Sequence, residues 1–553
     1  MDKNNIELSI LPLGSLSSLS LNGSLDNSAN YANNNNNNNN NNTHEQILIK
    51  QTTGKIPKIC YLLCTVEFAE RLSYYLISGC LTNMIQRFLP LNSTTGSVLN
   101  YNSDETPGAL GLGLPIASFT MQLLTCISYL SPLISGYLSD TKLGKWKSIW
   151  LGIWFGIVGH FLLVISALPI ILQRPWISYL IIIISIFTIA ISAGFIKPNI
   201  LPLLLDQYNY SPDKSDQMMD IDGTVWQINH QETLEKMSMT FYAFINWGCC
   251  IAIVGSFLER KFGFWFVYMI AAFIYSILPF IMYYLKPRLN YIEDKSSPIK
   301  SELYTELYQK VKGYIFNKNT LFINNGQIPN EQISPFITLI ILFLFFIPFY
   351  LNDLALTPLQ ISMAATMKPK LPLPNDFYQL LNPLTIIIAL PLISNIIYPI
   401  LQLNFNGEFY PSIRSKIFIG FMLVPIGSLF GLHVQYKIYK NSECGYNATN
   451  CHSPANVSIF TWIEYLLMFT FQALGECLAV TTTYELSYQY APNGCSSFII
   501  SLFLTMVAFG SILGEIGTIW WKDPFLINVW CSCLMLALFS GILFWLWRPK
   551  YIL

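Results

Sequence analysis

Charged residues are scarce in this chain. Of its 553 residues, 11% are charged and 53% are hydrophobic, whereas soluble domains carry about 25% charged residues. A water-soluble fold cannot hide so much apolar surface, so the composition predicts a protein that crosses a membrane several times. Acidic and basic residues balance at 31 each, which gives no reason to expect nucleic acid or an acidic surface as a partner.

The chain also lacks the closely spaced cysteines and histidines that bind metals. Its 12 cysteines are scattered, and most lie in apolar stretches, where a free cysteine acts as a small hydrophobic side chain. No ATP-binding or nucleophile motif is present. We therefore expect no metal and no cofactor, and we expect that the protein is not an enzyme.

Residues 1–55 have too few apolar side chains to form a core. They are rich in asparagine and serine, with an unbroken asparagine run from Asn33 to Asn42. This composition predicts a disordered cytosolic tail. The tail has no charged start, apolar centre and small-residue cleavage site, so it does not read as a signal peptide.

Twelve apolar segments follow, each close to the 20 residues that a helix needs to cross a bilayer. We expect them at 59–89, 115–138, 147–168, 177–200, 238–258, 264–285, 335–356, 383–403, 417–435, 461–484, 498–520 and 527–547. A polar, basic stretch, 286–333, divides them into two groups of six, within residues 56–285 and 334–553. The fold class expected is thus an all-α membrane protein with twelve transmembrane helices.

Two features set the expected orientation. With the N-terminus and C-terminus in the cytosol, the basic stretch 286–333 falls inside, as the positive-inside rule requires, although Lys437 and Lys440 fall outside. The same orientation places glycosylation sequons at Asn92, Asn447 and Asn456 outside.

Cys444 and Cys451 flank the polar loop that carries the Asn447 sequon. A disulfide needs the same non-cytosolic side as a glycan. We therefore predict a disulfide between these two cysteines, and glycans at the three outer sequons.

Two groups of six spans around a cytosolic linker are the arrangement of the major facilitator fold, in which a site lies between two bundles near mid-membrane. The loop between the second and third spans supports this fold. It carries Asp140 and Lys145, and it resembles the major facilitator loop in which such groups hold the cytosolic gate closed.

The first span carries the most unusual pattern. Five polar side chains follow a spacing of three and four residues, which places them on one helical face. They are Glu67, Glu70, Arg71, Tyr74 and Tyr75. Each charge at mid-membrane costs roughly 2.5–3.5 kcal/mol, so this stripe must face a protein or water-filled interior. It predicts an ion or substrate pathway.

The stretch Glu67–Tyr75 resembles the ExxERFxYYG motif of the proton-dependent oligopeptide transporter family, also called the solute carrier 15 family. Further pieces resemble the family in its own order, and they are Tyr129–Gly136, Gly194–Asn199, Phe241–Gly248, Leu381–Pro383 and Gly475–Glu476. The resemblance extends from about residue 56 to residue 550 and implies the major facilitator fold.

The resemblance implies that Glu67, Glu70 and Arg71 couple transport to protons together with Lys197. A buried carboxyl group suits this task, because burial favours its protonated form and a nearby cation favours the carboxylate. The alternative is a permanent ion-pair network that only holds the helices together.

The family's substrate site maps onto a second set of residues. Glu476 would bind the amino terminus of a peptide, and Lys197 would meet its carboxylate unless it extends to the membrane interface instead. The other residues expected to bind substrate are Tyr74, Tyr75, Tyr129, Asn246 and Asn382. The two asparagines could instead join helices through hydrogen bonds.

Several positions depart from peptide-transporting members, including Gln122, which stands where animal members have a histidine. Ser78 stands where many peptide-transporting members have an arginine, and Asn352 stands where they have the acidic residue that pairs with this arginine. Phe503 stands where animal members have a tryptophan. Asp353 follows Asn352, but one helical step turns a side chain by about 100°. We therefore expect Asp353 to face away from the site.

Together, these patterns predict a monomeric symporter that moves di- and tripeptides with protons by alternating access, in a plasma or endolysosomal membrane. Two alternatives remain open at this point. One is a proton-coupled transporter of histidine, nitrate or another small nitrogenous solute. The other is a nutrient receptor that keeps the fold without transporting.

Overall fold

The computed structural model describes residues 50–98, 107–209, 217–219, 225–289, 330–368, 380–404, 411–451, 455–492, 494–517 and 523–548, and the single residues 306 and 309. Residues 1–49 of the predicted tail and most of the predicted linker 286–333 lie outside the described residues.

The predicted spans of the first half each coincide with one helix or with two consecutive helices. These are α1 (Lys58–Gln86), α2 (Leu114–Leu138), α3 (Lys145–Ser166), α5 (Pro175–Asn209), α6 (His230–Ile251) with α7 (Val254–Phe262), and α8 (Phe264–Ser276) with α9 (Leu278–Leu285). Short helical turns join or extend them, and these are η1 (Ser139–Leu143), α4 (Pro169–Leu172) and η2 (Lys286–Arg288).

The second half follows the same plan. Its helices are α11 (Asn330–Tyr350) with η4 (Leu351–Ala355) and α12 (Thr357–Thr366), α13 (Leu381–Leu392) with η6 (Ile393–Ile397) and α14 (Tyr398–Asn404), α15 (Ile413–Asn441), α16 (Ile459–Gln489), α17 (Ser496–Gly517) and α18 (Leu526–Leu546). A 3-10 turn, η7 (Gly445–Asn450), follows α15.

Within the described ranges, ten helical stretches are long and apolar enough to cross a membrane. The other two predicted spans are α1, of 29 residues, and α2, of 25 residues. Helix α1 is less apolar because it carries Glu67, Glu70 and Arg71. The outward faces of the bundles carry large apolar side chains such as Trp154, Phe273 and Phe539, as expected for surfaces that meet lipid.

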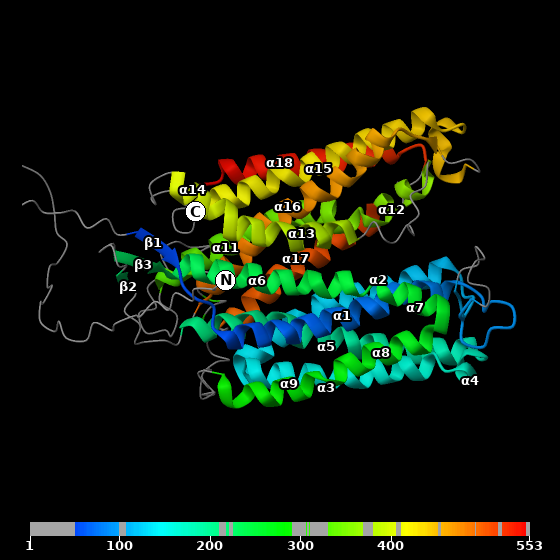
Figure 1. Cartoon of the computed structure of the whole chain (residues 1–553), viewed down its shortest axis with the longest axis horizontal. Coiled ribbons are helices and arrows are strands. Elements are labelled where there is room, and N and C mark those ends of the chain that lie inside the picture. Colours follow the sequence, from blue (N-terminus) through cyan, green and yellow to red (C-terminus); the bar gives the residue numbers. More distant parts are fainter. Residues whose placement is uncertain are drawn as a thin grey trace, which may run out of the picture. The chain divides into compact units, whose positions relative to one another are not determined.

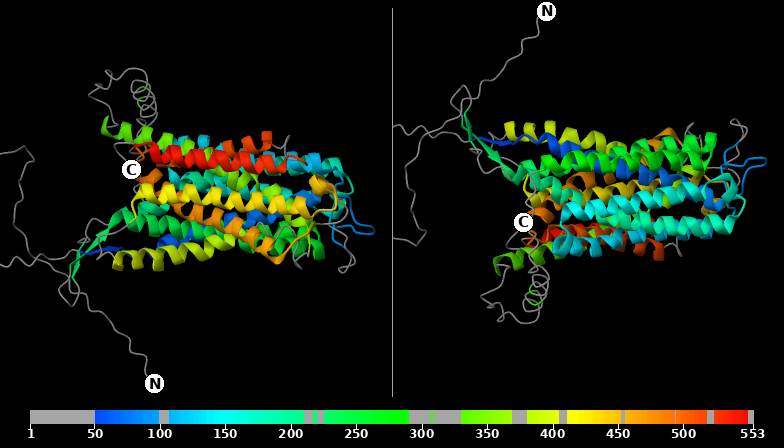
Figure 2. Two further views of the ribbon diagram at one scale, coloured as in Figure 1. Left: turned by 90° about the horizontal axis from the view of Figure 1, so that it is seen from above. Right: turned by 90° about the horizontal axis from the view of Figure 1, so that it is seen from below.

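Each half forms its own bundle. In the first, α1 packs against α2, α5, α6 and α8, and α3 packs against α5. In the second, α15 packs against α16 and α18, and α11 packs against α17. Figure 1 shows the first bundle below, and α13, α15, α16 and α18 above. The bundles meet where α2 contacts α17 and where α6 contacts α13 and α16, and Figure 2 shows the helices from two further sides.

A small sheet corrects the boundary of the predicted tail. Strand β1 (Lys50–Thr53) pairs in parallel with β3 (Val225–Asn229), and β2 (Gln217–Met219) pairs antiparallel with β3. Residues 50–53 were expected to be disordered, but their backbone groups join the ladder of β3, just before α6. A second pairing joins β4 (Met367–Lys368) to β5 (Ala455–Asn456).

Candidate functional site

The charged side chains of α1 are buried. Glu67, Glu70 and Arg71 each have an exposed fraction of 3% or less. Arg71 Nε lies 3.1 Å from Glu67 Oε1, and Arg71 Nη2 pairs with Glu70. Buried charges persist when they are paired. With both acids ionised, these three groups carry one excess negative charge, which a second cation or a proton can balance.

Lys197 of α5 lies close enough to the α1 acids to interact with them electrostatically. It is buried, and its Nζ lies 4.0 Å from the centre of the Tyr129 ring and 5.5 Å from that of Tyr74. Aromatic faces attract an ammonium group. Nζ makes no hydrogen bond in the described part of the chain, so its donors remain available for a carboxylate. Because the side chain is buried, it does not extend to a membrane interface.

Gly194 allows α5 to approach α2 closely enough for this arrangement. A Cβ atom on Gly194 would lie 2.0 Å from Ser131 Oγ, so a larger residue would force the two helices apart. Ser131 Oγ donates to the Ala190 carbonyl over 3.1 Å, and the Ser135 hydroxyl donates to the Gly194 carbonyl. Small residues and serine hydroxyls are typical of close helix contacts in membranes.

Glu476, buried in α16, is the centre of an acceptor group on the second bundle, and it accepts hydrogen bonds from both bundles. Asn382 Nδ2, from α13, donates to Glu476 Oε1 over 2.6 Å. The Tyr242 hydroxyl, from α6, donates to Glu476 Oε2, and this bond connects the two bundles. The Tyr242 and Tyr484 ring centres are 6.3 Å apart. Glu476 therefore lies where the bundles meet.

Asp353 belongs to this acceptor group, so the expectation that it faces away from the site is wrong. Asn382 Nδ2 lies 3.3 Å from Asp353 Oδ1, and Asp353 is buried. The reason is η4, a π-helix, in which the wider turn changes the direction of each side chain. Asn352 points elsewhere, because its Nδ2 donates to the Cys533 carbonyl over 2.9 Å and its Oδ1 accepts from Ser428 over 2.8 Å.

The remaining predicted substrate-binding residues take different positions. Tyr75 is half-buried and meets Tyr74 edge to face, with ring centres 5.6 Å apart. Asn246 Nδ2 donates to the Tyr242 carbonyl of its own helix over 2.8 Å. Phe503, at the departing position, packs edge-on against Tyr484 at 5.2 Å.

The two predicted gate residues take part in contacts at the end of the bundles where α1 begins. Asp140 Oδ2 accepts a hydrogen bond from the backbone N–H of Phe498 over 2.8 Å. A carboxylate suits this place in the first turn of α17. Lys145 Nζ lies 2.6 Å from Asp206 Oδ2, and Asp206 Oδ1 accepts the Tyr488 hydroxyl over 2.6 Å. The Asp140–Phe498 and Asp206–Tyr488 bonds join the two bundles.

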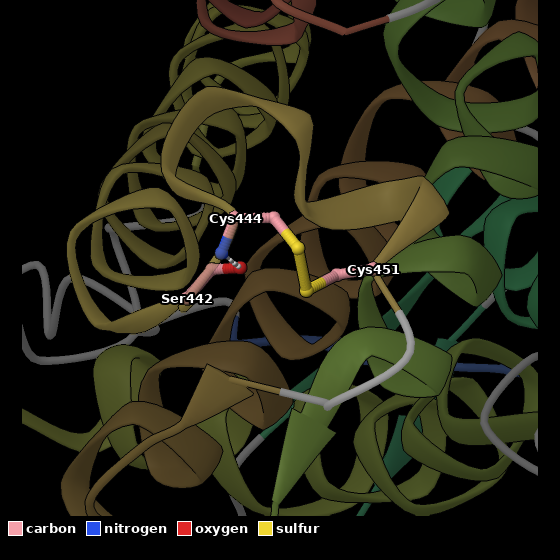
Figure 3. Close-up of a disulfide and its surroundings, with 3 residues drawn as sticks. All are labelled: Ser442, Cys444 and Cys451. Carbon is pink, nitrogen blue, oxygen red and sulfur yellow. Dashed lines mark hydrogen bonds between the residues drawn. A yellow bond between two sulfur atoms is a disulfide. The ribbon is translucent and has the colours of Figure 1, made fainter.

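The opposite end carries the predicted disulfide and sequons. Cys444 and Cys451 are joined by a disulfide (Figure 3). Asn447, between them in the sequence, is exposed, as are Asn92 and Asn456. Exposure leaves these three side chains accessible for a glycan.

Sequence reasoning did not identify several polar contacts that join the bundles. Gln122 of α2 donates to Glu515 of α17, on the side of the disulfide loop. Glu235 of α6 pairs with Lys416 of α15. Their only signal in the sequence is a polar residue inside or beside an apolar helix, which does not reveal the partner.

Comparisons with known proteins give the family. The protein-family model described as "POT family" matches residues 146–298 and 293–522 of this chain. The peptide transporter PTR2 of Candida albicans is 33% identical over 541 residues, covering 90% of this chain and 84% of that protein. The MFS-type transporter ucsM of an Acremonium species is 30% identical over 526 residues, covering 91% of this chain and 85% of that protein.

A solved structure shares the fold. The crystal structure of a peptide transporter POT in complex with sulfate has a TM-score of 0.59 and 18% sequence identity, covering 89% of this chain and 94% of that chain. The three proteins are named as transporters and not as enzymes, in agreement with the sequence prediction. The family match and the two relatives span most of this multi-pass membrane protein, and the chain therefore belongs to the POT family, the proton-dependent oligopeptide transporters.

Proposed function

We propose that this protein carries short peptides across a membrane together with protons. The observation that supports this most directly is the opposite chemistry of the two bundles. Lys197 offers an ammonium group with available donors, and Glu476 lies in a group of acceptors. A zwitterionic peptide presents a carboxylate at one end and an ammonium group at the other, so it complements both. The Candida albicans relative is named as a peptide transporter, which agrees with this substrate.

The acceptor group favours a peptide over a small anion. Nitrate would satisfy Lys197 but would leave Glu476 and Asp353 without a cation. In free histidine the ammonium and carboxylate groups are attached to the same carbon atom, whereas Lys197 and Glu476 belong to different bundles. A peptide separates its terminal charges by at least one peptide bond, which suits groups on two bundles.

Charge balance links peptide binding to proton binding. Glu67 and Glu70 are balanced by Arg71 and Lys197 in the absence of substrate. A peptide carboxylate at Lys197 takes up one of these cations, so the two α1 acids then share Arg71 alone. A proton on one acid restores neutrality. Each ligand therefore favours the other, as reciprocal linkage requires.

Alternating access would break the contacts at one end of the bundles while those at the other end hold. At one end these are the Asp140–Phe498 and Asp206–Tyr488 bonds, and at the other the Gln122–Glu515 bond. In this proposal the Asp140 end faces the cytosol with both termini, and the disulfide loop faces outside. The protein works as a monomer in a plasma or endolysosomal membrane, with the proton as coupling ion and without another cofactor.

Uptake of labelled Ala-Ala into proteoliposomes under an inward proton gradient tests this function. We expect the wild type to accumulate the peptide, and Glu67→Gln to lose accumulation while retaining exchange without a gradient. The matched control is Glu464→Gln, since Glu464 pairs with Lys437 and His433 away from the site. Accumulation by Glu67→Gln at the wild-type level would remove Glu67 from coupling. A wild type that accumulates no peptide would favour the receptor alternative.

A further inference from the structure

Two buried carboxyl groups lie side by side in the second bundle. Asn382 Nδ2 donates to Glu476 Oε1 over 2.6 Å and lies 3.3 Å from Asp353 Oδ1. The two carboxyl groups also interact with each other directly. Asp353 is 4% exposed and Glu476 is 6% exposed. Two carboxylates in contact repel each other unless a positive charge or a proton joins them.

The groups that face this pair supply no positive charge. Within the described ranges they are an amide, hydroxyl groups and thiols. They belong to Tyr242 and Cys249 from α6, Tyr350 from α11, Asn382 from α13, Cys477 and Tyr484 from α16, and Tyr129 from α2. Within the described residues, no salt bridge joins this pair to either of the two buried cations of the first bundle. Arg71 pairs with the acids of α1, and Lys197 lies over Tyr129.

The pair also has a spare acceptor beside it. Asn382 Oδ1 is buried and makes no hydrogen bond within the described part of the chain. A buried acceptor without a donor costs free energy. Asn382 Nδ2 and the Tyr242 hydroxyl donate to the carboxyl pair, but Asn382 Oδ1 has no donor among the described residues. The site that these residues form therefore has more acceptors than donors and lacks positive charge. Such a site is complementary to a ligand that brings two cationic groups.

We propose that Asp353 makes this a site for two positive charges, so that the protein prefers peptides whose first residue is lysine or arginine. This inference rests on the proposed function, in which Glu476 holds the amino terminus of the peptide. The side-chain cation of the first residue then lies at Asp353, and Asn382 Oδ1 accepts one of its hydrogen bonds. With a neutral first residue, a proton must take the place of that cation.

The geometry favours the first residue over the second. The acceptor oxygens of Glu476 and Asp353 contact the same nitrogen, so they are close together. The amino terminus and the first side chain leave the same carbon atom, and the flexible four-carbon stem of lysine can bring its two ammonium groups close to one another. A basic second residue begins beyond the peptide bond, on the side of Lys197, where its charge is unfavourable.

The test compares KM values for Lys-Ala, Ala-Lys and Ala-Ala uptake into proteoliposomes, for the wild type and Asp353→Asn. One charge-assisted hydrogen bond corresponds to about a tenfold change in affinity. We expect a KM for Lys-Ala about tenfold below that for Ala-Ala in the wild type, and no such preference for Ala-Lys. Asp353→Asn keeps the size of the side chain and should remove the Lys-Ala preference. Glu464→Gln, a matched loss of one carboxylate elsewhere, should retain it.

The readout is the ratio of two KM values, so it does not depend on the overall rate of a variant. Equal KM values for Lys-Ala and Ala-Ala in the wild type would overturn the inference, and so would an Asp353→Asn variant that keeps the preference. Should Asp353→Asn fail to fold, competition against labelled Ala-Ala in the wild type decides, with Lys-Ala expected to inhibit more strongly than Ala-Lys. A wild type that accumulates no dipeptide would instead refute the proposed function.

Discussion

Lys416 of α15 and Glu235 of α6 form a buried ion pair between the two bundles. Lys416 Nζ lies 2.5 Å from Glu235 Oε2, and the exposed fractions of the two side chains are 3% and 2%. The Tyr398 hydroxyl donates to the other oxygen of Glu235 over 3.3 Å. The Asp140–Phe498 contact lies at this same end. The ion pair therefore contributes to holding the bundles together where α1 begins.

Removing one member of this pair should destabilise the closed arrangement. Lys416→Met leaves the buried carboxylate of Glu235 uncompensated, at a cost of about 3–5 kcal/mol. The double variant Glu235→Gln/Lys416→Met removes both charges and should recover much of that loss. Thermal unfolding of the purified protein in detergent measures the difference. A double variant no more stable than Lys416→Met would contradict this account.

Lys197→Gln should weaken the binding of peptides that carry a free carboxylate. The variant removes the ammonium group over Tyr129, so we expect the KM for Ala-Ala to rise by about tenfold or more. Ala-Ala amide, which has no carboxylate, should bind equally well to both proteins. Competition against labelled Ala-Ala measures this. Lys142→Gln, at an exposed lysine, is the control for loss of a lysine charge. Equal inhibition by Ala-Ala and by Ala-Ala amide in the wild type would count against a role of Lys197 in carboxylate binding.

Gly194→Ala should disturb the contact between α2 and α5. The added methyl group would lie 2.0 Å from Ser131 Oγ, and overpacking of this kind costs about 1–3 kcal/mol. Gly79→Ala is the matched control, because a Cβ atom there meets nothing within 4 Å and alanine is the better helix former by about 0.5–1 kcal/mol. Melting temperatures of the two variants should move in opposite directions. Equal shifts would mean that the packing at Gly194 does not limit stability.

Glycan mapping should reveal the orientation of the chain. In a eukaryotic host we expect Asn92→Gln, Asn447→Gln and Asn456→Gln each to abolish one glycan. Each variant should then run faster on a gel than the wild type, and glycosidase treatment should remove this difference in mobility. The sequon at Asn209, on the opposite end, should remain unmodified because glycans attach on the non-cytosolic side. A glycan on Asn209 would reverse the proposed orientation.

Several features were predictable because one local property decides each of them. The apolar segments locate the helices, since bilayer thickness sets the length of a span. The α1 stripe predicted an inward face, and Glu67, Glu70 and Arg71 are buried as expected. The spacing of Glu67 and Arg71 also placed them within reach of each other on one helix, because residues four apart are neighbours.

Other features depend on a departure from regular helix geometry. The resemblance aligned Asn352 with the family's acidic position, and a helical step of about 100° turned Asp353 away from the site. The π-helix η4 instead places Asp353 beside Asn382. A π-helical turn follows from how neighbouring helices pack around a segment. Pro348 lies three residues before η4 and disturbs the regular helix there, but it does not by itself specify a π-helical turn.

The sequence by itself determined that this chain spans a membrane with two sets of helices and that its first helix carries charges toward the interior. Only the tertiary structure decided which polar groups meet, such as Glu235 with Lys416 and Tyr242 with Glu476. The physical reason is that apolar length and helical periodicity act within one segment. A contact between bundles depends instead on how two helices far apart in the sequence are rotated and displaced against each other.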